Sequence, residues 1–137
     1  MPATTTCQAM IYLMVITSAS DRDMTDVELA RIGEVVRTWP VFQDFDADKL
    51  VATAQTCQKL IAGEAGLDGV LKLAHATIPE RLRDTAYAAA FEVAAVDLEM
   101  RMEEARVLDR LREVLELEDN VAFAIERAAK ARHRTLT

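Results

Sequence analysis

Residues 20–28 read SDRDMTDVE, and residues 96–104 read VDLEMRMEE. The first stretch marks the start of a helix, because Thr25 and Glu28 have the spacing of a capping box, in which each side chain accepts a hydrogen bond from the other residue's backbone N–H. When the two stretches are aligned, three carboxylates coincide, 76 positions apart: Asp21 with Asp97, Asp23 with Glu99, and Glu28 with Glu104. The chain therefore contains the same acidic helix start twice.

The correspondence extends into the flanking helices. An apolar segment precedes each acidic stretch and an amphipathic segment follows it. The matching apolar positions are Ala19 with Ala95, Leu29 with Ala105, Ile32 with Leu108, and Val35 with Leu111. We expect two helical hairpins, in repeat units around residues 3–37 and 80–115, that pack with approximate two-fold symmetry.

The spacing of apolar residues predicts an all-α fold of seven helices, because apolar positions recur at intervals of three and four and no stretch alternates as a strand does. The scarcity of breakers agrees, with four Gly and three Pro in 137 residues. The predicted helices cover roughly 3–19, Thr25 to Pro40, Asp46 to Gly66, 67–74, Pro79 to Val96, 101–115 and 119–133.

The first and fifth helices are predicted to be the most buried. The run AMIYLMVI at 9–16 is apolar on every side, and the small residues of YAAAFEVAA at 87–95 favour a central position for the fifth helix.

The aromatic side chains of WPVFQDF at 39–45 are expected to fill the gap between the second and third helices, the alternative being an exposed patch that docks a partner. The inward positions expected in the third, sixth and seventh helices are Ala47, Leu50, Ala54, Cys57 and Ile61; Ala105, Leu108, Leu111 and Leu115; and Val121, Ala124, Ile125 and Ala128.

Length and charge bound the function. A chain of this length forms one domain, residues 1–137. Its net charge of −7 argues against nucleic acid as a partner.

The apolar run at 9–16 is too short to span a membrane and no Lys or Arg precedes it, so we expect neither membrane insertion nor a signal peptide. Two lone cysteines, Cys7 and Cys57, favour reduced thiols in the cytoplasm. The basic end KARHR at 130–134 complements a helix dipole, or contacts an anionic partner.

The two acidic trios are the candidate functional site. Clustered carboxylates without neighbouring His or Cys suit oxygen-seeking cations such as Ca²⁺, Mg²⁺ or Mn²⁺. The EF-hand pattern fails, because Asp26 stands where that loop needs Gly and Ile32 where it needs Glu. Dipole and capping effects explain the first trio alone, but Arg101 replaces the capping threonine in the second. We therefore predict a divalent-cation site formed by Asp21, Asp23, Glu28, Asp97, Glu99 and Glu104.

Catalysis is not expected. His75 and His133 lie in no nucleophile motif, and the chain has no glycine-rich phosphate loop. The alternative to metal binding is a protein-interaction module, in which the acidic face docks a basic partner surface without any metal.

The stretches ASDRDMTDVE and AVDLEMRMEE resemble the repeated motif of the TerB (tellurite-resistance) family. The resemblance covers nearly the whole chain. It implies a seven-helix, pseudo-symmetric domain that brings its acidic turns together to bind a divalent metal, and a non-catalytic role in tellurite or chemical-stress resistance beside membrane-protein partners. Whether the chain forms a homodimer is left open. The glycine usual after the first aspartate is replaced by Arg22 and Leu98, which reshapes the turn and places a positive charge near the first trio.

Overall fold

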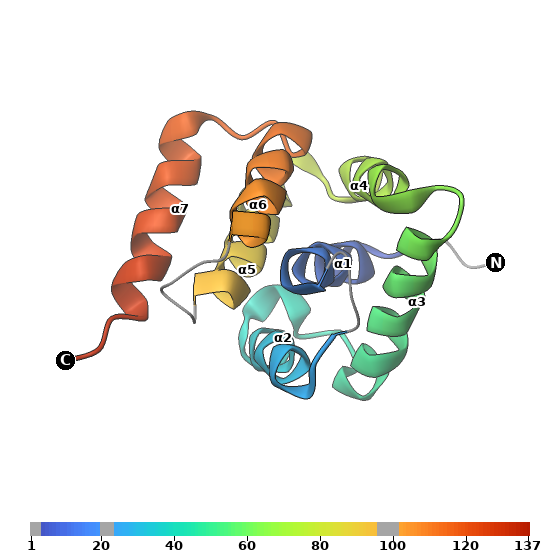
Figure 1. Cartoon of the computed structure of the whole chain (residues 1–137), viewed down its shortest axis with the longest axis horizontal. Coiled ribbons are helices and arrows are strands. Elements are labelled where there is room, and N and C mark those ends of the chain that lie inside the picture. The colour runs from blue at the N-terminus through green and yellow to red at the C-terminus, as the bar shows by residue number, and fades with distance from the viewer. Residues whose placement is uncertain (1–3, 20–23, 96–101) are drawn as a thin grey trace.

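The computed structural model describes residues 4–19, 24–95 and 102–137, with side chains from residue 104 onward in the last range. Within these ranges the chain contains no strand, so the predicted all-α fold is confirmed (Figure 1). The α-helices are α1 (Thr6–Ala19), α2 (Asp26–Thr38), α3 (Leu50–Ala62), α4 (Gly66–Thr77), α5 (Arg83–Ala95), α6 (Met102–Val114) and α7 (Asp119–Arg132). Three short 3₁₀ helices connect them: η1 (Pro40–Phe42), η2 (Ala47–Lys49) and η3 (Glu80–Leu82).

Helix α1 is buried on all sides. Every residue from Ala9 to Ala19 is buried, as the uninterrupted apolar run predicts. Helices α2 to α6 all pack against it. Because α1 has no solvent-facing side, the helix depends on its neighbours: each large side chain that leaves water there stabilises the fold by about 1.5–3 kcal/mol.

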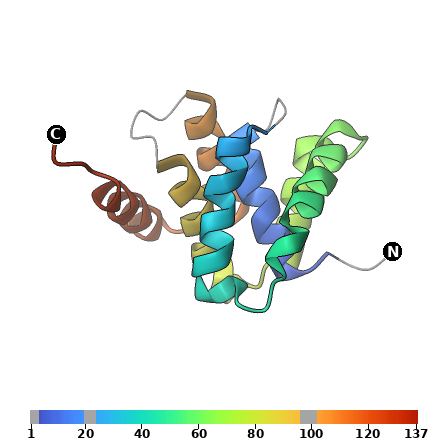
Figure 2. The ribbon, with the colours of Figure 1, turned by 90° about the horizontal axis from the view of Figure 1, so that it is seen from below.

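Helix α5 shares the centre with α1. It packs against α1, α2, α6 and α7, and its buried side chains include five alanines that permit close approach. The prediction of a central fifth helix is therefore confirmed, with α1 as its equal. Helix α7 lies at the edge of the molecule and packs mainly on α5 (Figures 1 and 2).

The first residues of α2 form the predicted capping box. The Thr25 N–H donates to Glu28 Oε1 at 2.9 Å, and the Glu28 N–H donates to Thr25 Oγ1 at 3.1 Å. Both donors would otherwise be unsatisfied at the start of the helix.

The aromatic segment after α2 packs inward. Phe42 is buried, while Trp39 and Phe45 are partly buried against the core. The prediction that this segment fills the space after α2 is confirmed, and it forms no exposed aromatic patch. Pro40 ends α2 and begins the 3₁₀ turn η1, because its ring cannot continue the α-helical hydrogen bonding.

Four of the residues predicted to face inward are exposed, so those predictions were wrong. Ala47 is exposed in the 3₁₀ turn η2, which precedes α3 and is capped by Asp46. Ala105 is exposed in α6. In α7 the buried residues are Ala122 and Ala129, whereas the predicted Ala124 and Ala128 face solvent.

The error in α7 has a physical cause. Alanines occupy five positions around this helix, on several of its faces, so their spacing does not identify the face that packs. Hydrophobic periodicity fixes a helix face only where large apolar side chains are confined to one stripe. Within the described ranges, no helix has the length and hydropathy needed to cross a bilayer.

Candidate functional site

The helix ends that flank the two acidic stretches lie on the same side of the molecule (Figure 2). Helices α1 and α2 flank the first stretch, and α5 and α6 flank the second. In Figure 2 the ends of α1 and α5 and the beginnings of α2 and α6 all lie towards the upper side of the view. Helices α1 and α5 are in direct contact. The two helices therefore bring the points at which the acidic stretches begin to the same side of the core.

Glu28 is committed to the helix start. Its Oε1 atom accepts hydrogen bonds from the Thr25 backbone at 2.9 Å and from the Thr25 hydroxyl at 3.1 Å. The side chain is partly exposed in the first turn of α2, where its negative charge also meets the positive end of the helix dipole. Glu28 therefore has a structural role that is independent of any metal.

Glu104 occupies the corresponding place in the first turn of α6 and is also partly buried. The other four carboxylates of the predicted site, Asp21, Asp23, Asp97 and Glu99, lie outside the described residues. Within the described ranges, no group of three His, Cys, Asp or Glu side chains is arranged to hold a metal ion. The cation site thus stays a prediction that depends on the two turns.

A charged cluster joins α5 to the end of α7. Glu92 accepts a 2.6 Å hydrogen bond at Oε2 from Arg132 Nη2, and its Oε1 contacts His133 Nε2. The Glu92 side chain is only 12% exposed. Burial alone would raise its pKa, but the hydrogen bonds and charges of Arg132 and His133 outweigh that effect and hold the pKa below its usual value.

The same interface has a second polar contact. The Tyr87 hydroxyl donates to Glu126 Oε2 at 3.0 Å, and burial and the Glu126 charge raise the pKa of Tyr87. Since Ala122 and Ala129 are the fully buried residues of α7, its attachment to α5 combines a narrow apolar contact with these two polar contacts.

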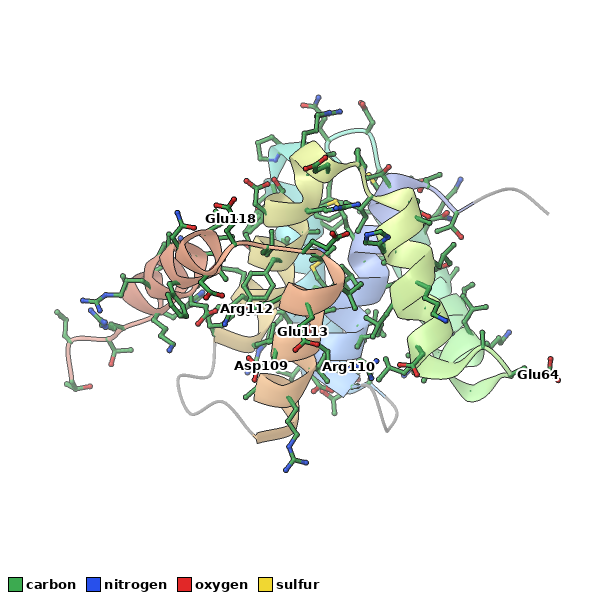
Figure 3. All side chains as sticks on the ribbon, turned by 90° about the horizontal axis from the view of Figure 1, so that it is seen from above. Glu64, Asp109, Arg110, Arg112, Glu113 and Glu118 are labelled. Carbon is green, nitrogen blue, oxygen red and sulfur yellow. The ribbon has the colours of Figure 1, made fainter. Side chains whose placement is uncertain are left out.

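A groove of about 500 Å³ lies between α4 and α6. Leu71 and Val114 are among its apolar residues. Arg110 on α6 pairs with Asp68 on α4 at one point along it, and Figure 3 shows Arg110 on the α4 side of α6. The groove is lined by acidic and basic side chains together, so its charge favours neither an anion nor a cation.

Glu116 lines this groove and has an unusual backbone conformation. Its φ of 56° places a residue with a Cβ in the left-handed region. The Leu117 N–H donates to the Arg112 carbonyl at 3.1 Å, and the Glu116 N–H to the Glu113 carbonyl at 3.1 Å, which is a Schellman motif ending α6. The carboxylate contacts His75 Nε2 at 2.6 Å and Arg83 Nη1 at 3.6 Å, and these contacts lower the pKa of Glu116.

A second hollow, of about 330 Å³, lies where α6 turns into α7. Arg112 pairs with Asp119 at 2.7 Å, and its guanidinium lies 5.1 Å from the centre of the Phe123 ring. Figure 3 shows Asp109 and Arg112 on the side of α6 that faces α7. The arrangement fixes the turn between the two helices through one charge-assisted hydrogen bond and one cation–π contact.

Cys7 is partly buried and Cys57 is buried, and the two are not joined by a disulfide. Burial raises the pKa of Cys57 to about 12. A thiol held in this protonated form is a poor nucleophile.

The pairings of Glu92 and Glu116 were missed by the sequence reasoning, which interpreted His133 and His75 by their own surroundings. One signal was available: Glu92 is the only charged residue in YAAAFEVAA. An isolated charge in an apolar helix needs a partner. Its partners lie 40 and 41 positions away, beyond the reach of any local pattern.

Comparison with known proteins gives one match. The family model described as "Tellurite resistance protein TerB" matches residues 7–127, which includes both acidic stretches. No curated protein and no solved structure matches the chain.

Proposed function

Because the chain belongs to the TerB family, we propose that it is a non-catalytic, divalent-cation-binding scaffold module of tellurite or chemical-stress resistance. TerB is a family of helical domains that is not known for catalysis. The observation that carries the proposal is the duplicated carboxylate trio, because the family match covers both copies and the helices on either side of each copy are present.

The chemistry of the donors fits a hard cation. Carboxylate oxygens from Asp21, Asp23, Asp97 and Glu99 would supply ligands for Ca²⁺, Mg²⁺ or Mn²⁺. Glu28 holds the start of α2 through its Oε1 atom, and its carboxylate would contribute to the metal site from the first turn of that helix. Glu104 would contribute from the first turn of α6. A bound cation would offset the mutual repulsion of carboxylates in the two turns and make the stability of the fold depend on metal.

The proposed cellular setting follows the family. The domain would be cytoplasmic, and a protein partner such as a membrane-protein complex would hold it at the inner face of the membrane. The competing function is an acidic docking face that binds a basic partner surface without metal. Metal dependence of folding separates the two proposals.

The test is thermal unfolding of chelator-stripped protein titrated with Ca²⁺, Mg²⁺ and Mn²⁺. A cation at about 100 times its Kd adds about 2.7 kcal/mol to the free energy of unfolding, which corresponds to an increase in Tm of roughly 8–12 °C for a domain of this size. Asp21→Asn and Asp97→Asn should each remove most of this gain if the two turns share one ion.

Asp48→Asn is the matched control. Asp48 is an exposed carboxylate in η2, away from both turns, and its substitution should leave the metal response intact. If every cation raises Tm no more than salt of equal ionic strength, metal binding is rejected and the docking-face alternative takes its place.

A further inference from the structure

The outer face of α7 carries a row of cations on an otherwise acidic protein. Arg127 and Lys130 are exposed on the helix, and Arg134 follows just beyond its end, at spacings of three and four residues. The spacing of three residues places Arg127 and Lys130 on one side of α7, and Arg134 adds a third cation directly after the helix. None of the three makes an ion pair with any residue in the described ranges. This cation stripe stands out on a chain with a net charge of −7.

The acidic residues of α7 are both engaged elsewhere. Asp119 pairs with Arg112 at the beginning of the helix, and Glu126 accepts a hydrogen bond from Tyr87 on the α5 side. The exposed face therefore has no carboxylate of its own to neutralise the cation stripe. Unpaired charges that repel one another on one helix face favour a partner of opposite sign.

Apolar side chains accompany the cation stripe. Phe123 is 57% exposed although Arg112 of α6 lies 5.1 Å from the centre of its ring, and it begins the same row, one helical turn before Arg127. Ala124, Ala128 and Ala131 form an adjacent exposed row, which we call the alanine stripe. Small side chains allow a second helix to approach closely, at the near end of the usual 8–10 Å interaxial range. A partly exposed aromatic ring beside them is typical of an anchor residue at an interface.

We propose that the outer face of α7 is a docking surface for an acidic amphipathic helix of a protein partner. The partner's apolar residues would pack on the alanine stripe and Phe123, and its Glu or Asp side chains would pair with the cation stripe. This surface is separate from the two acidic stretches, so the inference does not rest on the proposed metal function.

Charge and shape favour this occupant over two others. A second copy packed through the same helix about a two-fold axis would bring the two cation stripes near each other. An anionic lipid surface would attract the three cations by about 1 kcal/mol each, but interfacial helices need a large apolar face, and here only Phe123 is large.

The experiment uses the full chain, labelled with ¹⁵N, and a synthetic amphipathic helix with a Leu/Ala seam flanked by glutamates. Titration should perturb amide resonances of α7, and binding should weaken as salt is raised because the contact is charge-dependent. The double substitution Arg127→Glu/Lys130→Glu should weaken binding at least tenfold, and Phe123→Ala should weaken it severalfold.

The matched control is Lys49→Glu/Lys59→Glu, which changes net charge equally. These exposed lysines lie in η2 and α3, on the opposite side of the molecule from α7 (Figure 1). The control should change affinity less than twofold. An equal loss of peptide affinity in both double variants would mean that net charge alone determines binding, and would overturn the proposal.

Two further outcomes would also overturn it. One is absence of binding by the wild-type chain. The other is tighter binding to vesicles of phosphatidylcholine with about one-third phosphatidylserine than to the peptide, when the same α7 substitutions abolish it, because the surface would then recognise lipid. A lysine-flanked version of the peptide should not bind.

Discussion

Glu92 shows how one residue can join two distant parts of the chain. It lies among small apolar residues in α5, where an unpaired carboxylate would be costly. Arg132 and His133 at the end of α7 satisfy it. The basic end of the chain thus complements a helix terminus, as its position predicts, and also forms a specific contact with a mostly buried carboxylate.

We predict that Glu92→Gln lowers the free energy of unfolding by about 1–2 kcal/mol at neutral pH, because charge-assisted hydrogen bonds are lost. The folded-state pKa of Glu92 is lowered, so its stabilisation is present above the ordinary glutamate pKa and is lost as pH falls through the folded value. Urea unfolding at several pH values should show the difference from wild type shrinking in acid.

Glu113→Gln provides the control for this prediction. Glu113 is exposed on α6 and has no ion-pair partner within the described ranges. Its substitution should change stability by less than about 0.5 kcal/mol at every pH. A Glu92→Gln effect that stayed constant into acid would contradict the assigned ion cluster.

The end of α6 shows how local backbone strain is tolerated at the scale of a helix. Glycine is the usual residue in the left-handed position of a Schellman motif, but here Glu116 occupies it. Its carboxylate gains contacts with His75 and Arg83, although its side chain is 65% exposed, so solvent weakens these contacts. The turn between α6 and α7 is therefore held by hydrogen bonds and ion pairs despite an unfavourable φ.

We predict that Glu116→Gly is more stable than Glu116→Ala by about 1 kcal/mol, because both lose the carboxylate and only glycine relieves the strain. Urea unfolding of the two variants measures the difference directly. At Glu113, inside α6, the order should be reversed, with glycine less stable than alanine by about 1 kcal/mol. Equal stability of Glu116→Gly and Glu116→Ala would mean that the position carries no strain.

At the scale of the whole molecule, the fold is organised around α1. Five other helices pack against it, and α5 beside it carries α7 at the periphery. Substitutions in the core of α1 should therefore lower the stability of the entire domain. Substitutions on the outer face of α7 should weaken only partner binding. The two acidic stretches begin where the two central helices end, which relates the candidate metal site to the core.

We predict that Leu13→Ala, at a fully buried position of α1, lowers the free energy of unfolding by about 2–5 kcal/mol. Leu136→Ala is the matched control, because Leu136 is fully exposed and should contribute less than about 0.5 kcal/mol. Thermal unfolding followed by far-UV circular dichroism should show one cooperative transition at lower temperature for Leu13→Ala. Loss of only part of the helical signal would contradict the central role of α1.

Sequence patterns predicted the fold class, the capping box at Thr25 and the full burial of the first helix, because these features depend on contacts a few residues apart. The acidic stretches also allowed family membership to be expected. The same patterns misplaced the buried face of α7, where alanines on several faces give periodicity no large side chain to mark it. The arrangement of Asp21, Asp23, Asp97 and Glu99, which lie outside the described residues, stays a prediction.

The sequence by itself determined that the chain is helical, where most of its helices begin and end, and which helices are most apolar. Those properties follow from side-chain propensity, capping and spacing along one segment. Only the tertiary structure decided which face of α7 meets α5, that Glu92 pairs with Arg132 and His133, and that Glu116 reaches His75. These contacts join residues about 40 positions apart, and their formation depends on how separate helices pack.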